Sequence, residues 1–175
     1  MSMLNPDPVF VLGNIKLKIG LATASLAAPS LATEINAAGS LDVSFFVVGD
    51  FEPTFEPNVG NAPARLATKL QLPSEGLVQL QPITVEYVFS PQAASNADAN
   101  KAKAFLTRGV EFFAWERRGL DAETVAYATT QLVRTWKFRA GLQNETTAGD
   151  GEFRQFVVRQ QWFPLIQPVA GAIAA

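Results

Sequence analysis

Two carboxylates, Glu52 and Glu56, are the residues whose types come nearest to a catalytic pair. Paired carboxylates serve as acid and base in glycosidases, where they lie roughly 5 to 9.5 Å apart. Four residues of extended chain separate these two by ~13 Å at about 3.3 Å per residue, which is too far. The chain has no Cys and no His, which removes thiol and imidazole catalysis and the metal sites built on those ligands. We therefore expect no enzyme, no cofactor and no metal.

The segment around Glu52 and Glu56 has two other interpretations. It is either an acidic exposed loop, or an assembly loop in which Phe51 and Phe55 are apolar anchors beside Glu52 and Glu56. Burying one Phe contributes roughly 1.5 to 3 kcal/mol, so two anchors repeated at every subunit would hold a polymer together. We name these four residues as candidate inter-subunit contacts.

The charge of the chain is low and balanced. Lys and Arg number 14 and Asp and Glu 16, and charged residues make up 17% of the sequence, against about 25% in an average globular protein. A net charge of −2 does not suit a protein that coats nucleic acid or binds a membrane surface. Low charge is typical either of a surface covered by other protein or of an Ala-rich domain. No segment has the roughly 20 apolar residues of a membrane helix.

Alternation of apolar and polar residues predicts a mainly β protein with one domain over residues 1–175. The predicted strands are 14–19, 41–48, 83–89, 110–117, 132–139 and 153–162. One flanking helix is predicted from about Ala97 to Leu106, closed by Gly109. Turns are expected at Gly119 and at 148–151, which makes the late strands a meander.

Three segments show no sustained period. Residues 49–81 contain several prolines and form a predicted long central loop, and loops of that length are usually functional or disordered. Residues 1–12 and 164–175 are predicted to be extended arms. The second of these tails is uncharged, and such tails usually stay flexible unless a partner holds them.

Arginines alternate with aromatic residues in the last three strands. Single-strand nucleic-acid platforms, strand cores and protein interfaces all have this mixture. A β-sandwich module that binds carbohydrate or protein through Trp115, Trp136 or Trp162 stays open as an alternative.

The second half of the chain resembles the major tail tube protein of long-tailed, siphovirus-like bacteriophages. The resemblance rests on Val85-Glu86-Tyr87-Val88-Phe89-Ser90-Pro91-Gln92, an Asn- and Ala-rich helix, Leu106-Thr107-Arg108-Gly109, and Phe113-Ala114-Trp115-Glu116-Arg117-Arg118-Gly119. Gln160 and Gln161 before an aromatic and a proline are similar too. The match runs from about residue 77 to 164 and is looser before that.

The resemblance implies a two-sheet β-sandwich with a flanking helix. It also implies a homo-oligomer of hexameric rings that stack into a tube and contact other phage tail proteins. DNA would pass through the lumen without specific binding, and the subunit would be made in the host bacterial cytoplasm before joining the virion. Another tail or neck component on the same fold remains an alternative.

Four arginines on the late strands are candidates for ion pairs between subunits. They are Arg134, Arg139, Arg154 and Arg159. Such pairs at a solvated rim contribute about 0 to 1 kcal/mol each, so reversing one charge should weaken assembly without unfolding the subunit.

Overall fold

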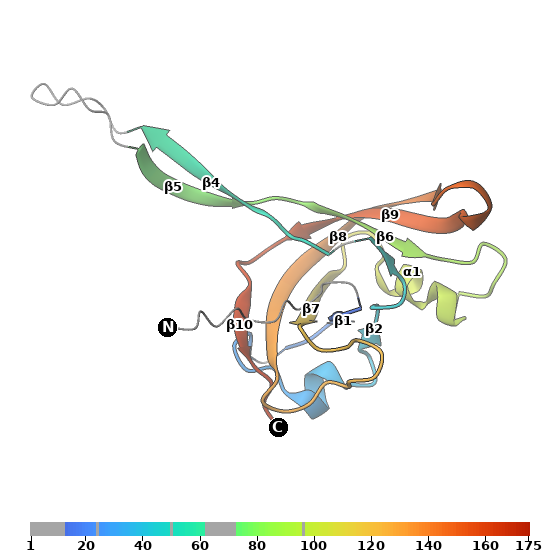
Figure 1. The fold of residues 1–175 in the computed structure, drawn as a ribbon, viewed down its shortest axis with the longest axis horizontal. Helices are drawn as coiled ribbons and strands as arrows, with labels where there is room; N and C mark the ends of the chain where they lie inside the picture. Colours follow the sequence, from blue (N-terminus) through green and yellow to red (C-terminus); the bar gives the residue numbers. More distant parts are fainter. Residues whose placement is uncertain (1–12, 24, 50, 62–72, 96) are drawn as a thin grey trace, which may run out of the picture.

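The computed structural model describes residues 13–23, 25–49, 51–61, 73–95 and 97–175. The described part folds into a strongly curled antiparallel sheet, from which a separate two-stranded hairpin projects (Figure 1). The prediction of a mainly β protein is confirmed. The two layers of the expected sandwich are parts of one hydrogen-bonded sheet, because that sheet curls back on itself. The predicted N-terminal arm at 1–12 lies outside the described residues.

The strands of the sheet follow the order β2-β1-β7-β8-β9-β6-β3, with β10 beside the first part of β8. Their bounds are β1 Ile15–Gly20, β2 Leu41–Asp42, β3 Val47–Val48, β6 Ile83–Val88, β7 Glu111–Arg118, β8 Leu132–Ala148, β9 Gln155–Pro164 and β10 Val169–Ala172. Consecutive strands β7, β8 and β9 form the predicted meander. Gly119 and Gly151 have positive φ at its two turns, a conformation that glycine adopts without steric cost.

The single strand predicted at 41–48 is wrong. The structure places two short strands there, β2 and β3, at the two ends of the sheet. Between them the backbone turns, with the amides of Phe46 and Val47 donating to the carbonyl of Val43. The hydroxyl of Ser44 accepts a hydrogen bond from the amide of Leu17. This corner bonds to both β1 and β6 and so closes the curl: the amide of Val43 donates to the carbonyl of Leu17, and the amide of Val88 donates to the carbonyl of Phe46.

The flanking helix is shorter than predicted. A 3-10 turn at Asp98–Asn100 leads into α1, Lys101–Phe105, within the predicted span of 97–106. The side-chain amide of Asn100 is buried and bonds Ser90, Ala93 and Ala94. The amide therefore holds the loop before the helix rather than capping the helix itself.

The helix is tied to the sheet by a buried polar network. The amide of Gln160 donates to the carbonyls of Leu106 and Gly141, and its oxygen accepts from Tyr87 and Trp162. The amide of Gln143 donates to the carbonyl of Leu106 as well. Because buried polar groups are costly unless bonded, this network fixes the end of α1 against β8 and β9.

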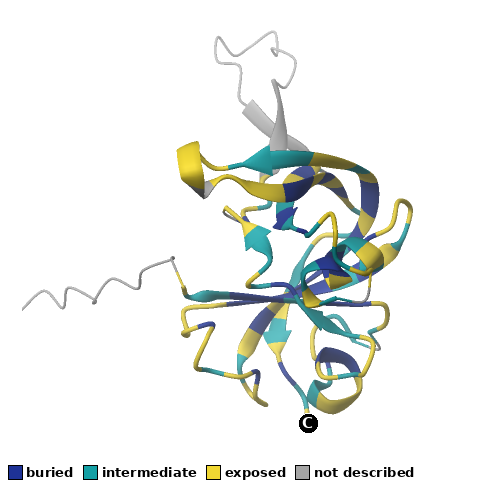
Figure 2. Ribbon diagram, turned by 90° about the vertical axis from the view of Figure 1, so that its right-hand side faces the viewer, coloured by how far each residue is buried: buried dark blue, intermediate teal, exposed yellow. Residues whose placement is uncertain are grey.

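The two faces of the sheet each cover a core (Figure 2). The larger core contains Phe112, Trp136, Phe138 and Trp162 among others, and the smaller one contains Ile35, Trp115, Tyr127, Val133 and Ile173. The middle of the sheet is therefore buried on both sides. This explains why Lys16, which points to the opposite face from Leu17, is only 9% exposed.

The prediction of a C-terminal arm at 164–175 is wrong for residues 169–172, which form β10. Val169–Ala172 pairs with Leu132–Thr135 of β8, and Ile173 is buried. The amide of Leu31, at the start of a short π-helix at Leu31–Ile35, donates to the carbonyl of Ala174. The end of the chain therefore belongs to the smaller core.

The prediction that the central segment 49–81 is a long loop is wrong. The segment contains two paired strands, β4 Phe55–Asn61 and β5 Pro73–Leu80, with a register shift between Pro57 and Val59. Figure 1 shows this hairpin extending far from the body at the upper left. We call β4 and β5 the hairpin and the rest of the described chain the body.

Candidate assembly interface

The structure offers little for catalysis. Glu52 is exposed before the hairpin and Glu56 lies within β4. Among the described residues no three His, Cys, Asp or Glu side chains gather as a metal site would require. No helix in the described part has the length and apolar character needed to cross a membrane.

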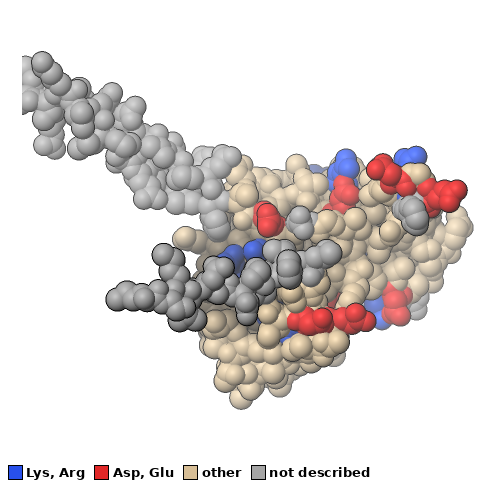
Figure 3. Space-filling model, viewed as in Figure 1, with Lys and Arg blue, Asp and Glu red and all other residues tan. Residues whose placement is uncertain are grey.

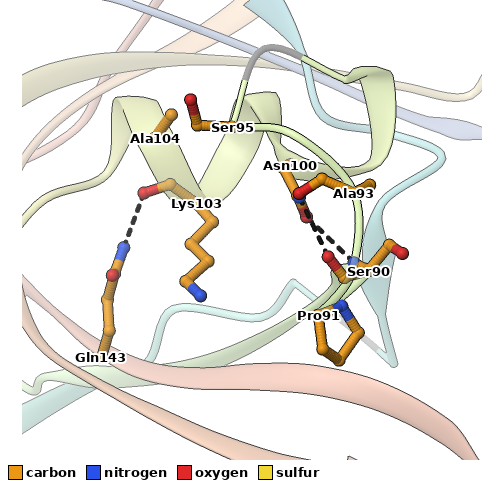
Figure 4. Close-up of a pocket in the computed structure, with 8 residues that line it drawn as sticks. All are labelled: Ser90, Pro91, Ala93, Ser95, Asn100, Lys103, Ala104 and Gln143. Atoms are coloured by element: carbon orange, nitrogen blue, oxygen red, sulfur yellow. Dashed lines mark hydrogen bonds between the residues drawn. The ribbon is translucent and has the colours of Figure 1, made fainter.

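A small pocket of about 250 Å³ lies between α1 and the loop before it (Figure 4). Its lining includes Ser90, Asn100, Lys103 and Gln143. The amide of Asn100 bonds the surrounding backbone, and the ammonium group of Lys103 lies 2.6 Å from a carboxylate oxygen of Glu145. The polar groups of Asn100 and Lys103 are thus engaged in holding the fold.

The three tryptophans are buried. Trp115 and Trp162 are 0% exposed and Trp136 is 1% exposed. A carbohydrate-binding platform needs aromatic faces open to solvent, so the binding module proposed through these residues is excluded. The same burial assigns most of the aromatic residues of the last three strands to the core and not to a nucleic-acid platform.

Phe51 is a core residue, and its assignment as an exposed assembly anchor is wrong. Its side chain is 4% exposed, and its ring lies 6.3, 6.2 and 6.0 Å from the rings of Trp136, Phe138 and Trp162. The contacts with Trp136 and Phe138 are edge-on, an arrangement that is favourable for aromatic rings. Phe51 therefore packs the segment before the hairpin, residues 51–54, against the larger core.

A buried carboxylate helps to hold the same segment, residues 51–54, on the body. Glu116 is 1% exposed, and it accepts hydrogen bonds from the indole of Trp136 at 3.0 Å and from the guanidinium of Arg118. Arg118 in turn donates to the carbonyl of Phe51 at 3.3 Å. Because charged hydrogen bonds are among the stronger ones in proteins, β7 and the segment before β4 are held together.

A buried cation organises the long connection between β7 and β8. Arg117 is 1% exposed and donates to the carbonyls of Asp121, Val125 and Ala126. The hydroxyl of Tyr127 donates to the carbonyls of Lys16 and Trp115. Burial raises the pKa of Tyr127 well above its usual range, and the nearby Asp42 carboxylate adds to the rise. Sequence reasoning missed this role, since an Arg at the end of a strand indicates exposure.

The four candidate arginines differ in their surroundings. Arg139 pairs with Glu111 at 2.7 Å, and Arg159 pairs with Glu86 at 2.6 Å. Arg154 donates to the hydroxyl of Thr147 at 2.8 Å. Arg134 is exposed and has no ion-pair partner among the residues that the structure describes. Arg134 is thus the most available of the four for a neighbouring molecule.

Large apolar side chains are exposed on the body in several places. Those exposed by more than half are Leu21, Phe45, Leu132, Leu142 and Phe156, with Leu132 the highest at 75%. Figure 3 shows wide areas without charged residues, above all in the part of the body near the C-terminus. Depletion of charged residues is typical of the cores of protein interfaces.

Comparison with known proteins identifies the family. A search of curated proteins finds no match. A model of the phage tail tube protein family matches residues 3–174, which is nearly the whole chain. The match agrees with the resemblance seen in the sequence and extends it into the first half. The chain therefore belongs to the phage tail tube protein family, whose members are structural proteins of the virion tail that assemble as multimers with other tail proteins.

Proposed function

We propose that this chain is the tube-forming subunit of a bacteriophage tail, and that it self-assembles into hexameric rings that stack into a tube. The lumen of the tube conducts the genome during delivery, and DNA passes through it without specific binding. The subunit is made in the host bacterial cytoplasm and has no enzymatic role. Family membership supports the tail tube role.

One observation carries the self-assembly proposal: a hairpin that projects from a closed body (Figure 1). Its register opposes Phe55 to Leu80 and Pro57 to Val78, which are two pairs of apolar residues. A two-stranded hairpin alone is marginally stable in water. The hairpin gains its stability from a surface outside its own protomer.

The inter-subunit contact residues of the proposal follow from exposure and location. Phe55, Glu56 and the exposed Glu52 lie in or beside the hairpin. On the body, Arg134 and Arg154 are exposed and form no ion pair among the described residues. Arg139 and Arg159 contribute less, because each already has a carboxylate partner within the protomer.

Electron microscopy of two purified proteins tests the proposal. The full chain should form rings and tubes in negative stain at high concentration, and averaged end views should show sixfold symmetry. A variant in which a short Gly-Ser linker replaces residues 55–80 should keep the thermal unfolding curve of the body and stay monomeric.

Two results would contradict the proposal. Normal tubes from the hairpin-less variant would remove the role of the hairpin. Full-length protein that stays monomeric under all conditions of salt and concentration, with added tail-tip proteins as initiators, would remove self-assembly itself.

A further inference from the structure

An exposed patch on one face of three adjacent strands has no covering element in the described structure. Leu132 and Arg134 of β8 pair with Ala172 and Ala170 of β10, so the four residues share a face of the sheet. All four are exposed. Glu116 of β7 pairs with Arg134 and therefore points to the same face. Arg118 is two residues further along β7, so its side chain points to that face as well. We call these five residues the β8 patch.

The patch is apolar with basic groups. Leu132, at 75% exposure, is the most exposed of the large apolar side chains of the described body, and the two alanines extend its apolar area. The only acidic residue on this face between the two arginines is Glu116, which is buried and already bonds Arg118 and Trp136. The charge of Arg134 is therefore left uncompensated within the described protomer.

The hairpin has the complementary character. The charged residues of β4 and β5 are Glu56 and Glu75, both acidic, and the remaining residues are apolar or uncharged. A projecting acidic and apolar element and an exposed basic and apolar patch thus occur on one chain. Complementary charge of this kind selects a partner and fixes the register of an interface.

We propose that the β8 patch receives the hairpin of a second copy of this chain. The inference rests on the proposed self-assembly and names the surface that the hairpin contacts. The two surfaces differ, so the contact is head to tail, and contacts of that kind propagate into rings or open polymers instead of stopping at a dimer.

Charge reversal and its rescue test the proposal in the full-length chain. R134E should raise the concentration needed for tube formation at least about tenfold, since like charges then face each other across every contact. The double variant E56K/E75K should have the same effect for the same reason. The triple variant R134E/E56K/E75K restores opposite charges at every contact and should assemble within about threefold of the unmodified chain.

An apolar variant tests the patch independently of charge. Leu132→Ser should also impair tube formation, while its thermal unfolding as a monomer stays unchanged because the side chain is already exposed. Arg108→Glu, at an exposed arginine in the turn after α1, is the matched control and should assemble normally.

The outcomes separate this proposal from the one on which it rests. Assembly of R134E at the concentration of the unmodified chain would overturn the patch, and so would a failure of the triple variant to recover while R108E assembles. If the hairpin-less variant forms normal tubes, the hairpin role itself falls. If that variant stays monomeric and R134E forms tubes, the hairpin role stands and it contacts another surface.

Discussion

The body and the hairpin are both antiparallel β structure, yet they are stabilised in different ways. In the body, β8 pairs with β7, β9 and β10 and covers a core on each face. The hairpin has two strands that pair only with each other. Stability thus resides in the body, and the hairpin is left for contact with other molecules. The junction between them, at Phe51 and Glu116, belongs to the body.

The largest expected effect separates two phenylalanines four residues apart. Phe51→Ala should lower the free energy of unfolding of the monomer by about 3 to 5 kcal/mol, because it opens a cavity beside Trp136, Phe138 and Trp162. Phe55→Ala, in the hairpin, should leave that free energy within about 0.5 kcal/mol and abolish tubes. Urea unfolding and electron microscopy measure the two quantities. Equal destabilisation by both changes would break the distinction between body and hairpin.

A smaller effect is expected where the end of the chain joins the body. A Cβ added at Gly171 would lie 1.7 Å from the carbonyl oxygen of Ala27. Gly171→Ala should therefore displace β10 and destabilise the monomer by about 1 to 3 kcal/mol. Gly39→Ala is the control, since a Cβ there meets no atom within 4 Å. An unchanged unfolding midpoint for G171A would mean that β10 behaves as a free arm.

The smallest effect is a loss of stability in alkali. The chain has two tyrosines, both in the body, and burial raises the pKa of Tyr87 and of Tyr127. The folded state thus holds the phenol protons more tightly than the unfolded state, whose tyrosines have a pKa of about 10. The two tyrosines should leave the free energy of unfolding unchanged below about pH 10 and lower it as the pH rises above that value.

Urea unfolding of the monomer between pH 8 and 11.5 measures this slope. Tyr127→Phe should flatten the slope, although it also removes the hydrogen bonds to Lys16 and Trp115 and so lowers stability at every pH. A slope that is identical in Y127F and in the unmodified chain would show that another group titrates.

Much of the body could be predicted from alternation alone. The strands β1, β6, β7 and β9 begin and end within two residues of the predicted bounds, because one face of each is apolar at strand spacing. The corner at Val43–Phe46 was not predictable, since its residues keep the alternation and only the closing of the sheet forces the turn. The burial of Phe51 was also hidden, because the aromatic rings that it packs against lie more than 80 residues away in sequence.

The hairpin was missed because of its prolines. Pro73 is the first residue of β5 and Pro57 stands at the irregularity of β4, which are the positions where strands at a sheet edge tolerate proline. The region of β10 was missed because its side chains are small: Gly171 faces the backbone of Ala27, and small residues give no strand period. At the candidate interface, the sequence indicated acidic residues and arginines, but not that Arg134 has no ion-pair partner among the residues described in the structure.

The corner between β2 and β3 has a kinetic consequence. The two-residue strands at the ends of the sheet path pair with β1 and with β6, whose sequence positions are more than 60 residues apart. Closing the sheet therefore needs both pairings, which bring β1 and β6 together across that length of chain, and we expect this step to come late in folding. Until then both β1 and β6 are open edges on which other chains can add. We expect a newly made subunit to be most prone to aggregate in that interval, which ends when residues 41–48 pair with β1 and β6.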